Sequence, residues 1–306
     1  MNLITAFFRL VRWQNLVFIA LTQSLFYFCV YQSLFVGEQN YPQLIWIMAA
    51  SILIAAGGYI INDYFDLNID LINKPFKNVI NIMISRRWAI AWHQMLSIAG
   101  VVCTIQAVSF QKWYLILANI LCVIFLWLYS TSFKRQLLIG NIVIAVLTAW
   151  TVLVVFYSFV PLRSAFGTND LSIVKFFRAA FLYAGFAFII TLIREAIKDM
   201  EDMKGDARYG CKTLPIVTGI TATKIYTMVW TIVLVGALIV SQLYILQFNW
   251  WWAVIYSVLL VIAPLFYFTS LLFKAQTQAE FKRLSSFTKW IMLAGILSMI
   301  FFKIYL

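Results

Sequence analysis

Long apolar runs occupy most of this 306-residue chain and restrict what it can fold into. A helix that crosses the hydrocarbon core of a bilayer needs about 20 residues. Nine such runs, none containing Asp or Glu, lie at 13–36, 43–61, 88–110, 112–132, 138–161, 174–193, 221–246, 250–273 and 287–305. Inside lipid the backbone must satisfy its own hydrogen bonds, so runs of this length imply helices. We therefore expect an all-α, polytopic membrane bundle of about nine transmembrane helices, forming one domain over residues 1–306.

The composition agrees with a membrane protein, because 64% of the residues are hydrophobic and 11% are charged. Soluble domains have about half apolar and a quarter charged residues. The net charge of +12 does not require nucleic acid as a partner. Lys and Arg gather in cytoplasmic loops and face anionic headgroups, so we expect membrane lipid and no nucleic acid. The four cysteines lack CxxC spacing, which argues against a disulfide framework or a zinc site.

The distribution of Lys and Arg predicts the orientation of the chain in the membrane. With a cytoplasmic N-terminus, alternation over nine spans puts 18 of the 23 basic residues on the cytoplasmic side and 5 on the other. This asymmetry satisfies the positive-inside rule. We expect an integral, multi-pass protein whose N-terminus and two long charged loops, 62–87 and 194–220, are cytoplasmic.

Acidic residues are concentrated in those same two loops. Eight of the 11 lie there: Asp63, Asp66 and Asp70 in the first, and Glu195, Asp199, Glu201, Asp202 and Asp206 in the second. Carboxylates crowded against a membrane repel one another and cost desolvation. Such clusters persist when a cation neutralises them, so both loops are candidates for metal binding.

The spacing of these residues indicates how the loops would hold a ligand. The first row steps by four residues through Asn62, Asp66 and Asp70, and the second steps by four through Arg194, Lys198, Asp202 and Asp206. If the helices continue past the membrane surface, each row lies along one helix face. Mg²⁺ prefers oxygen ligands and substrate phosphates, while Arg and Lys suit the remaining phosphate oxygens. Two facing rows would therefore hold a diphosphate through Mg²⁺.

Three motifs carry a resemblance to a known family. The segment from Asn62 to Asp70 reads NDYFDLNID and fits the pattern NDxxDxxxD. The segment from Arg194 to Asp206 reads REAIKDMEDMKGD and is followed by Gly210 and the tripeptide Thr-Leu-Pro, while a third motif joins Tyr129 to Lys134-Arg135. Over its whole length the chain resembles the UbiA-type superfamily of intramembrane prenyltransferases. Within it, the REAIKDMEDMKGD segment is most similar to archaeal-type digeranylgeranylglyceryl phosphate synthases.

The resemblance implies Mg²⁺-dependent transfer of a polyprenyl group from its diphosphate to a lipophilic acceptor. It favours a geranylgeranyl group as the group transferred, geranylgeranylglyceryl phosphate as the acceptor and a prokaryotic cell membrane as the location. The metal ligands implied are Asn62, Asp63, Asp66, Asp70, Asp199, Asp202 and Asp206. The residues expected to act in catalysis are Asp66, Asp70, Asp202, Asp206 and Lys198. The candidates for the diphosphate are Lys134, Arg135, Arg194 and Lys198, and those for the lipophilic acceptor are Arg12, Asn15 and Asn141.

Several alternatives stay open from the sequence. Arg12 and Asn15 are either a membrane-interface anchor and a helix contact or acceptor ligands, and Asn141 is either an interhelical hydrogen bond or an acceptor contact. The chain departs from the family pattern after Asp70, in the stretch 73–87, so the acceptor could instead be an aromatic quinone precursor. A membrane terpene cyclase would ionise the same diphosphate without an acceptor. An ion-coupled transporter is disfavoured because the acids lie at span ends.

Overall fold

Helices make up almost the whole of the computed structural model, which describes residues 3–73, 80, 84–167 and 169–306. Within these residues, nine helical segments are long and apolar enough to cross a membrane. They are Trp13–Leu34, Tyr41–Phe65, Arg86–Val108, Phe110–Thr131, Ile139–Phe159, Leu171–Arg208, Ile220–Leu246, Trp251–Lys274 and Gln278–Tyr305. The expected all-α bundle of nine spans is confirmed. Residues 74–79 and 81–83, most of the stretch that departs from the family pattern, lie outside the described residues.

Six of the nine spans contain a single α-helix each, and the other three contain two. The single helices are α4 (Tyr41–Phe65), α6 (Arg86–Val108), α7 (Trp113–Thr131), α8 (Ile139–Phe159), α10 (Leu171–Arg208) and α12 (Ile220–Leu246). The composite spans join α2 (Trp13–Leu25) to α3 (Gln32–Leu34), α13 (Trp251–Ser257) to α14 (Ala263–Lys274), and α15 (Gln278–Leu297) to α16 (Ile300–Tyr305). The short helices outside the spans are α1 (Leu3–Leu10), α5 (Leu67–Asn73), α9 (Leu162–Gly167) and α11 (Leu214–Thr218).

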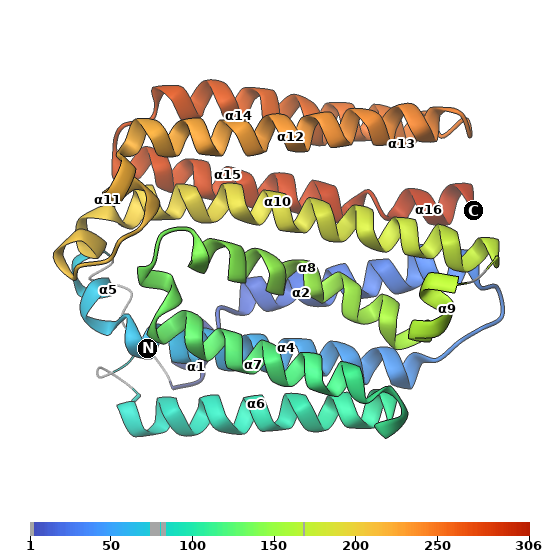
Figure 1. Cartoon of the computed structure of the whole chain (residues 1–306), viewed down its shortest axis with the longest axis horizontal. Helices are drawn as coiled ribbons and strands as arrows, with labels where there is room; N and C mark the ends of the chain where they lie inside the picture. The colour runs from blue at the N-terminus through green and yellow to red at the C-terminus, as the bar shows by residue number, and fades with distance from the viewer. Residues whose placement is uncertain (1–2, 74–79, 81–83, 168) are drawn as a thin grey trace.

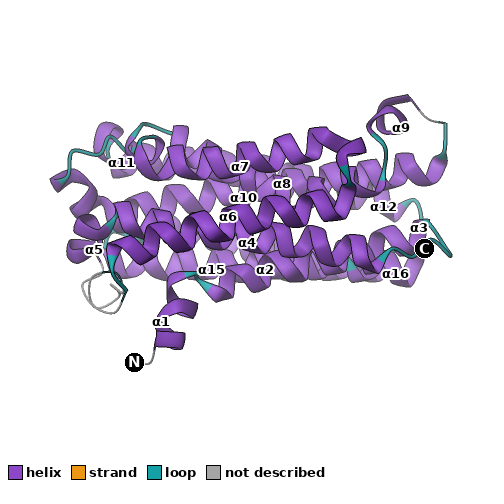
Figure 2. Cartoon of the chain, turned by 90° about the horizontal axis from the view of Figure 1, so that it is seen from below, coloured by secondary structure: helices purple, strands orange, loops and turns teal. Residues whose placement is uncertain are grey.

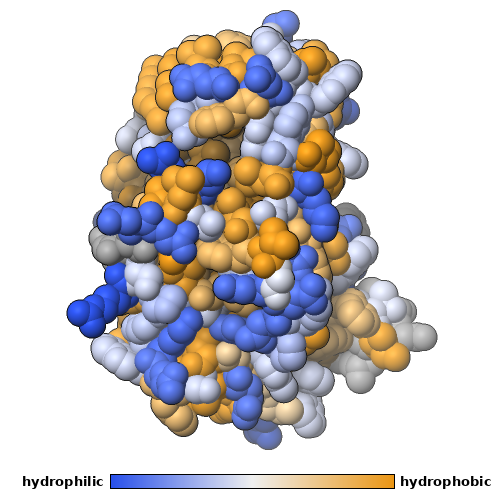
Figure 3. Space-filling model, turned by 90° about the vertical axis from the view of Figure 1, so that its right-hand side faces the viewer, coloured by the Kyte–Doolittle hydropathy of each residue, from blue (hydrophilic) through white to orange (hydrophobic). Residues whose placement is uncertain are grey.

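The long helices run side by side, so the ends of the bundle carry the connections (Figure 1). The N-terminus, α5 and α11 lie at one end, and α9 and the C-terminus lie at the other. Helix α1 projects sideways from the bundle near the first of these ends (Figure 2). Figure 3 looks onto the opposite end, where hydrophilic side chains are scattered among hydrophobic ones. Both acidic segments therefore lie at the same end as the N-terminus, as the alternation of the loops requires.

Polar residues at helix starts explain where several spans begin. Asn40 accepts a hydrogen bond from the Gln43 backbone N–H at 3.2 Å at the start of α4. Asp170 accepts one from the Ser172 N–H at 2.8 Å at the start of α10. Such caps satisfy backbone donors that have no partner inside the helix.

Small residues allow the helices to approach one another closely. Helices α4 and α6 meet at Gly100, where a Cβ atom would lie 2.6 Å from Ile54 Cγ1 and 3.1 Å from the Ala50 carbonyl oxygen. Without a hydrophobic driving force between helices in lipid, this close van der Waals packing stabilises their association. It fixes the position of α4, whose far end carries the first acidic motif.

The sixth span extends much further than the prediction of 174–193. Helix α10 contains 38 residues and continues through Arg208, so residues 194–208 are helical although the sequence indicated a loop from 194 to 220. The physical reason is that this segment contains no proline and is rich in Glu, Lys, Met and Ala, which favour helix. Gly210, at φ 70°, follows the helix end. The second acidic motif is thus carried on a rigid continuation of a membrane span.

Candidate active site

The first acidic motif lies where α4 ends and α5 begins. Asn62 is in the last turn of α4, and Asp66 interrupts the helix with φ −87° and ψ 0°. The Asp66 N–H still donates to the Asn62 carbonyl oxygen at 3.0 Å, and the Asp70 N–H donates to that of Asp66 at 2.8 Å. The expectation of one continuous helix is therefore wrong here, because the row bends at Asp66. The four-residue hydrogen-bond pattern is retained across the bend.

Arg12 holds this motif from the first span. It lies between α1 and α2 in the left-handed conformation, with φ 52° and ψ 52°. Its Nη2 donates to Asn62 Oδ1 at 3.1 Å and to Asp63 Oδ1 at 2.6 Å, while the guanidinium lies 5.1 Å from the centre of the Tyr59 ring. Burial lowers the pKa of Arg12, but Asp63 and its other partners raise it by more. Arg12 thus has a motif-holding contact that neither sequence interpretation included.

Lys134, which lies between α7 and α8, forms an ion pair with the first motif. Its ammonium group forms an ion pair with Asp66, whose side chain is buried. Burial lowers the pKa of Lys134, but Asp66, Tyr129 and, more weakly, Asp206 raise it above its ordinary value. A protonated lysine therefore lies within electrostatic reach of one carboxylate from each acidic motif. Its neighbour Arg135 accepts a backbone hydrogen bond from Lys212 at 2.8 Å.

The second motif begins with a charged triad on one face of α10. Glu195 Oε1 accepts hydrogen bonds from Arg194 Nη1 at 3.1 Å and from Lys198 Nζ at 2.7 Å, and Glu195 is buried. One turn further, Asp199 Oδ2 accepts a hydrogen bond from Asn141 Nδ2 of α8 at 2.8 Å. Asn141 therefore makes the interhelical bond, which was one of its two interpretations. Glu195 was counted among the acids of the sequence but was not predicted to belong to the site.

Asn73 joins the two acidic motifs directly, although no pattern in the sequence indicated such a role for it. Its Nδ2 donates to the Asp202 carbonyl oxygen at 2.9 Å, and its Oδ1 accepts from the Gly205 backbone N–H at 2.8 Å. These bonds connect the last residue of α5 to the last turns of α10. They bring the segment that carries Asp70 next to the segment that carries Asp206.

The residues at this junction fit a hard divalent cation. Asp66 and Asp206 come from different motifs, and each is 4% exposed. Among the described residues, no group of three or more His, Cys, Asp or Glu side chains is close enough to hold a metal ion without further ligands. Mg²⁺ is usually held by one or two carboxylates plus substrate phosphates, so a pair of carboxylates suffices. Asn62 Nδ2, which is buried without a hydrogen-bond partner among those residues, adds a donor for an anion.

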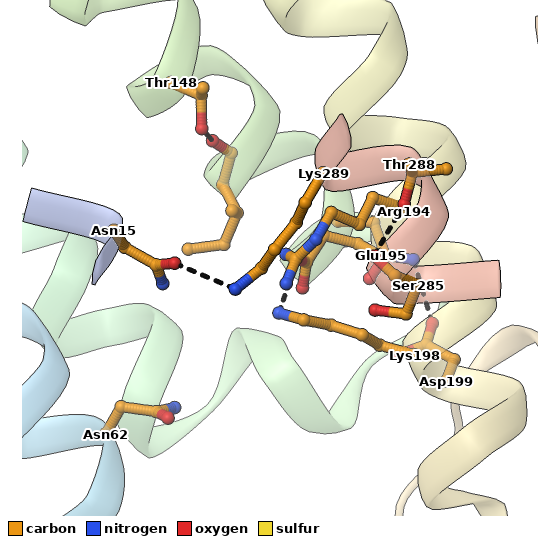
Figure 4. Close-up of polar contacts among 12 residues, drawn as sticks. Asn15, Asn62, Thr148, Arg194, Glu195, Lys198, Asp199, Ser285, Thr288 and Lys289 are labelled. Carbon is orange, nitrogen blue, oxygen red and sulfur yellow. Dashed lines mark hydrogen bonds and ion pairs between the residues drawn. The ribbon is translucent and has the colours of Figure 1, made fainter. Parts of the chain in front are cut away.

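A cavity of about 250 Å³ runs from this polar end into the bundle. Its polar end is lined by Arg12, Asn15, Asn62, Arg194, Lys198 and Lys289, and Figure 4 shows most of these side chains. Its deeper part is mainly apolar and aromatic, with Phe18, Ile54, Leu147, Trp150, Phe186 and Met299. The arrangement can receive an anion at the mouth and an apolar chain inside. Lys289 was counted only as a cytoplasmic basic residue, and its sequence offered no signal that it enters the cavity.

Comparison with known proteins agrees with this geometry. Residues 12–294 match the profile of the UbiA prenyltransferase family. A digeranylgeranylglyceryl phosphate synthase from Haloquadratum walsbyi is 34% identical over 193 residues, which are 63% of this chain and 62% of that protein, or about three-fifths of its length. The enzyme of the same name from Methanosphaera stadtmanae is 30% identical over 250 residues, covering 81% of this chain and 83% of the relative.

Solved structures share the fold over nearly the whole chain. A structure from work on digeranylgeranylglyceryl phosphate synthase in membranes superposes with a TM-score of 0.62 and 25% identity, covering 98% of this chain and 99% of the other. A UbiA homologue from Archaeoglobus fulgidus bound to GPP and Mg²⁺ superposes with a TM-score of 0.58 at 14% identity, covering 96% and 99%. Because the family profile matches well over half of the chain, this protein belongs to the UbiA prenyltransferase family and is an integral membrane prenyltransferase.

Proposed function

We propose that this enzyme transfers a geranylgeranyl group from its diphosphate to geranylgeranylglyceryl phosphate, with Mg²⁺ as the cofactor. The observation that carries the proposal is that both acidic motifs reach the polar end of an apolar cavity, which Asn62 of the first motif and Arg194, Glu195 and Lys198 of the second line, while Lys134 is paired with Asp66. The relatives named digeranylgeranylglyceryl phosphate synthase support the choice of donor and acceptor. An aromatic acceptor and a cyclase that lacks an acceptor are outcomes that the experiment below distinguishes.

In this proposal the diphosphate binds between the two acidic motifs. Asp66 and Asp206 are the first candidates to hold Mg²⁺, with Asn62, Asp70 and Asp202 beside them. Asp63 and Asp199 support the arrangement through Arg12 and Asn141 rather than as direct ligands. When bound, Mg²⁺ stabilises the negative charge that develops on the diphosphate as it leaves.

The cationic side chains share this task. Lys134, Arg135, Lys198 and Arg194 donate to phosphate oxygens of the leaving group. Breaking the bond between the allylic carbon and the diphosphate oxygen leaves the electron pair on the diphosphate and a positive charge on the prenyl group. A hydroxyl oxygen of the acceptor then bonds to that carbon, and the reaction releases diphosphate and one proton.

The apolar part of the cavity protects this intermediate. Water would quench an allylic cation, and the deep lining, which includes Phe186 and Trp150, excludes water from it. Aromatic faces also attract a cation electrostatically. The prenyl tail lies along these side chains, and the diphosphate stays at the polar end. With the N-terminus and both acidic motifs at one end of the bundle, the positive-inside rule supports a cytoplasmic active site in a prokaryotic cell membrane.

The decisive experiment incubates the purified enzyme with geranylgeranyl diphosphate and Mg²⁺ and identifies products by mass spectrometry. Geranylgeranylglyceryl phosphate and aromatic quinone precursors are offered as competing acceptors. We expect the diether lipid phosphate as the main product. A prenylated aromatic product would assign the other acceptor class, and a cyclic hydrocarbon without acceptor would assign a cyclase.

Variants test the metal and diphosphate chemistry in the same assay. Asp66→Ala and Asp202→Ala should lower the rate by about 100-fold or more, since removing one preorganised charge-stabilising group has an effect of that size. Asp170→Asn is the matched control, because Asp170 caps α10 at the opposite end and Asn caps a helix equally well. Full activity in either Ala variant, or a rate that EDTA leaves unchanged, would refute the metal-diphosphate mechanism.

A further inference from the structure

Lys289 reaches the cavity from a helix that carries neither acidic motif. It lies on α15, lines the cavity, and donates from Nζ to Asn15 Oδ1 of α2 at 3.2 Å. In Figure 4 its side chain points to Asn15 and into the space beside Arg194 and Lys198. Lys282, two turns earlier on α15, is exposed instead. Lys289 therefore differs from the basic residues that only mark the membrane surface.

The packing of α15 against α10 shows how deep Lys289 lies. Tyr183 Oη is 2.9 Å from Ser298 Oγ, and a Cβ atom on Gly295 would lie 2.5 Å from Phe186 Cε1. These two approaches set an antiparallel register in which Lys289 is level with Leu192. With a rise of about 1.5 Å per residue, that level is about 3 Å deeper than Arg194 and about 9 Å deeper than Lys198.

A second observation at the same depth indicates a ligand. Thr191 lines the cavity and is 4% exposed, yet its hydroxyl group has no hydrogen-bond partner among the described residues. Several other threonines in these spans bond to the carbonyl four residues earlier, as Thr148 and Thr227 do at 2.8 Å. Arg194 Nε, one turn along the same helix, is also buried without a partner in the described part of the chain. A buried polar group left unpaired is costly, so these donors are suited to a bound acceptor atom.

The net charge of the side chains that line the cavity favours bound anions. Among the described residues that line it, Arg12, Arg194, Lys198 and Lys289 are cationic, and Glu195 is the one acidic residue. In the proposed function the leaving diphosphate lies at the polar end, beside the ion pair of Lys134 and Asp66. The reacting prenyl carbon must lie on the inner side of that diphosphate. An acceptor whose phosphate and attacking hydroxyl share a short glycerol unit would place its phosphate near that carbon.

We propose that Lys289 and Thr191, with Arg194 Nε between the two anions, bind the phosphate of the acceptor, an inference that rests on the proposed function. Lys289 and Thr191 then determine specificity for a phosphorylated glyceryl ether. Asn15 holds the Lys289 ammonium in place. In this proposal the donor diphosphate contacts neither Lys289 nor Thr191, so changes at these two residues affect the affinity for the acceptor and not the affinity for the donor.

Steady-state kinetics of Lys289→Met, with each substrate varied in turn, test the proposal. The KM for geranylgeranylglyceryl phosphate should rise about 10- to 100-fold, the size expected for a hydrogen bond to a charged group, while the KM for geranylgeranyl diphosphate stays unchanged. Lys282→Met is the control on the same helix and should alter neither. With dephosphorylated geranylgeranylglycerol as acceptor, the wild type and Lys289→Met should react equally slowly.

A binding measurement and a second variant keep the result interpretable. Isothermal titration of geranylgeranylglyceryl phosphate without donor should show the same loss of affinity in Lys289→Met. If that variant does not fold, Thr191→Val removes the hydroxyl at constant volume and should raise the acceptor KM about 3- to 10-fold. An unchanged acceptor KM, or an equal rise for both substrates, overturns the inference while the proposed function stands. A wild type that prenylates no glyceryl acceptor refutes the proposed function itself.

Discussion

The hydrogen bonds between Asn73 and α10 predict that Gly205→Ala destabilises the protein when the Asn73 side chain is present and stabilises it when that side chain is absent. A Cβ atom at Gly205 would lie 2.5 Å from Asn73 Oδ1 and 2.6 Å from its Nδ2. Gly205→Ala must therefore displace the Asn73 side chain and break its bonds to Asp202 and Gly205. Two hydrogen bonds at about 1 kcal/mol each outweigh the helix propensity of about 1 kcal/mol that Ala gains over Gly. The net loss of stability is about 1 kcal/mol.

In an Asn73→Ala background the same substitution should stabilise the protein. The obstructing side chain and its two bonds are already absent, so only the helix propensity of about 1 kcal/mol is left. The assay is reversible unfolding of the four proteins in one detergent, followed by tryptophan fluorescence. The prenyl-transfer rate should fall in both single variants, because Asn73 sets the position of Asp70 relative to Asp206. Additive effects on stability, with the same sign in both backgrounds, would refute this account.

Two further predictions concern the bundle and the first motif. Gly100→Ala should destabilise the protein by about 1–3 kcal/mol in the same unfolding assay, because its Cβ would overlap Ile54. Gly236→Ala is the control: a Cβ there would have nothing within 4 Å, so this variant should be neutral or stabilised by up to about 1 kcal/mol. Arg12→Lys keeps the charge but not the planar guanidinium group that reaches Asn62 and Asp63, so it should raise the KM for geranylgeranyl diphosphate. Arg9→Lys is the control and should leave this KM unchanged. Equal kinetics of the two variants would contradict the role given to Arg12.

The sequence was sufficient to predict what depends on residue type and on spacing along the chain. Span length and hydrophobicity predicted all nine membrane helices, since both properties are local. Steps of four residues predicted the polar row on α10, and the hydrogen bonds from Arg194 and Lys198 to Glu195 lie on that face. The prediction was least accurate at Asp66, where backbone angles bend the helix that its spacing implied. The segment around Asp66 contains no proline or glycine, but it is rich in Asp and Asn, which favour helix ends over helix interiors.

Residues whose roles depend on contacts across the bundle could not be predicted. Asn73 and Gly205 are separated by 132 positions, and Lys289 and Asn15 by 274, so no local pattern joins them. Lysine is a residue type expected at the protein surface, and only the packing of α15 against α10 shows that Lys289 enters the cavity. Arg12 was expected to be either an interface anchor or an acceptor ligand, and neither interpretation included the ion pair with Asp63 that it makes from the left-handed turn between α1 and α2.

The contacts of the acidic residues explain how such a charged site can exist inside a membrane protein. An isolated buried carboxylate is strongly unfavourable, and burial is tolerated when the charge is paired and hydrogen-bonded. Asp63 is paired with Arg12, Asp66 with Lys134, and Glu195 with two cations of its own helix. In the proposed function, Lys134, Arg194 and Lys198 are also the side chains that donate to the diphosphate. In that proposal, the cations that pair with these carboxylates would already be in position to stabilise the leaving group, which is the preorganisation that electrostatic catalysis requires.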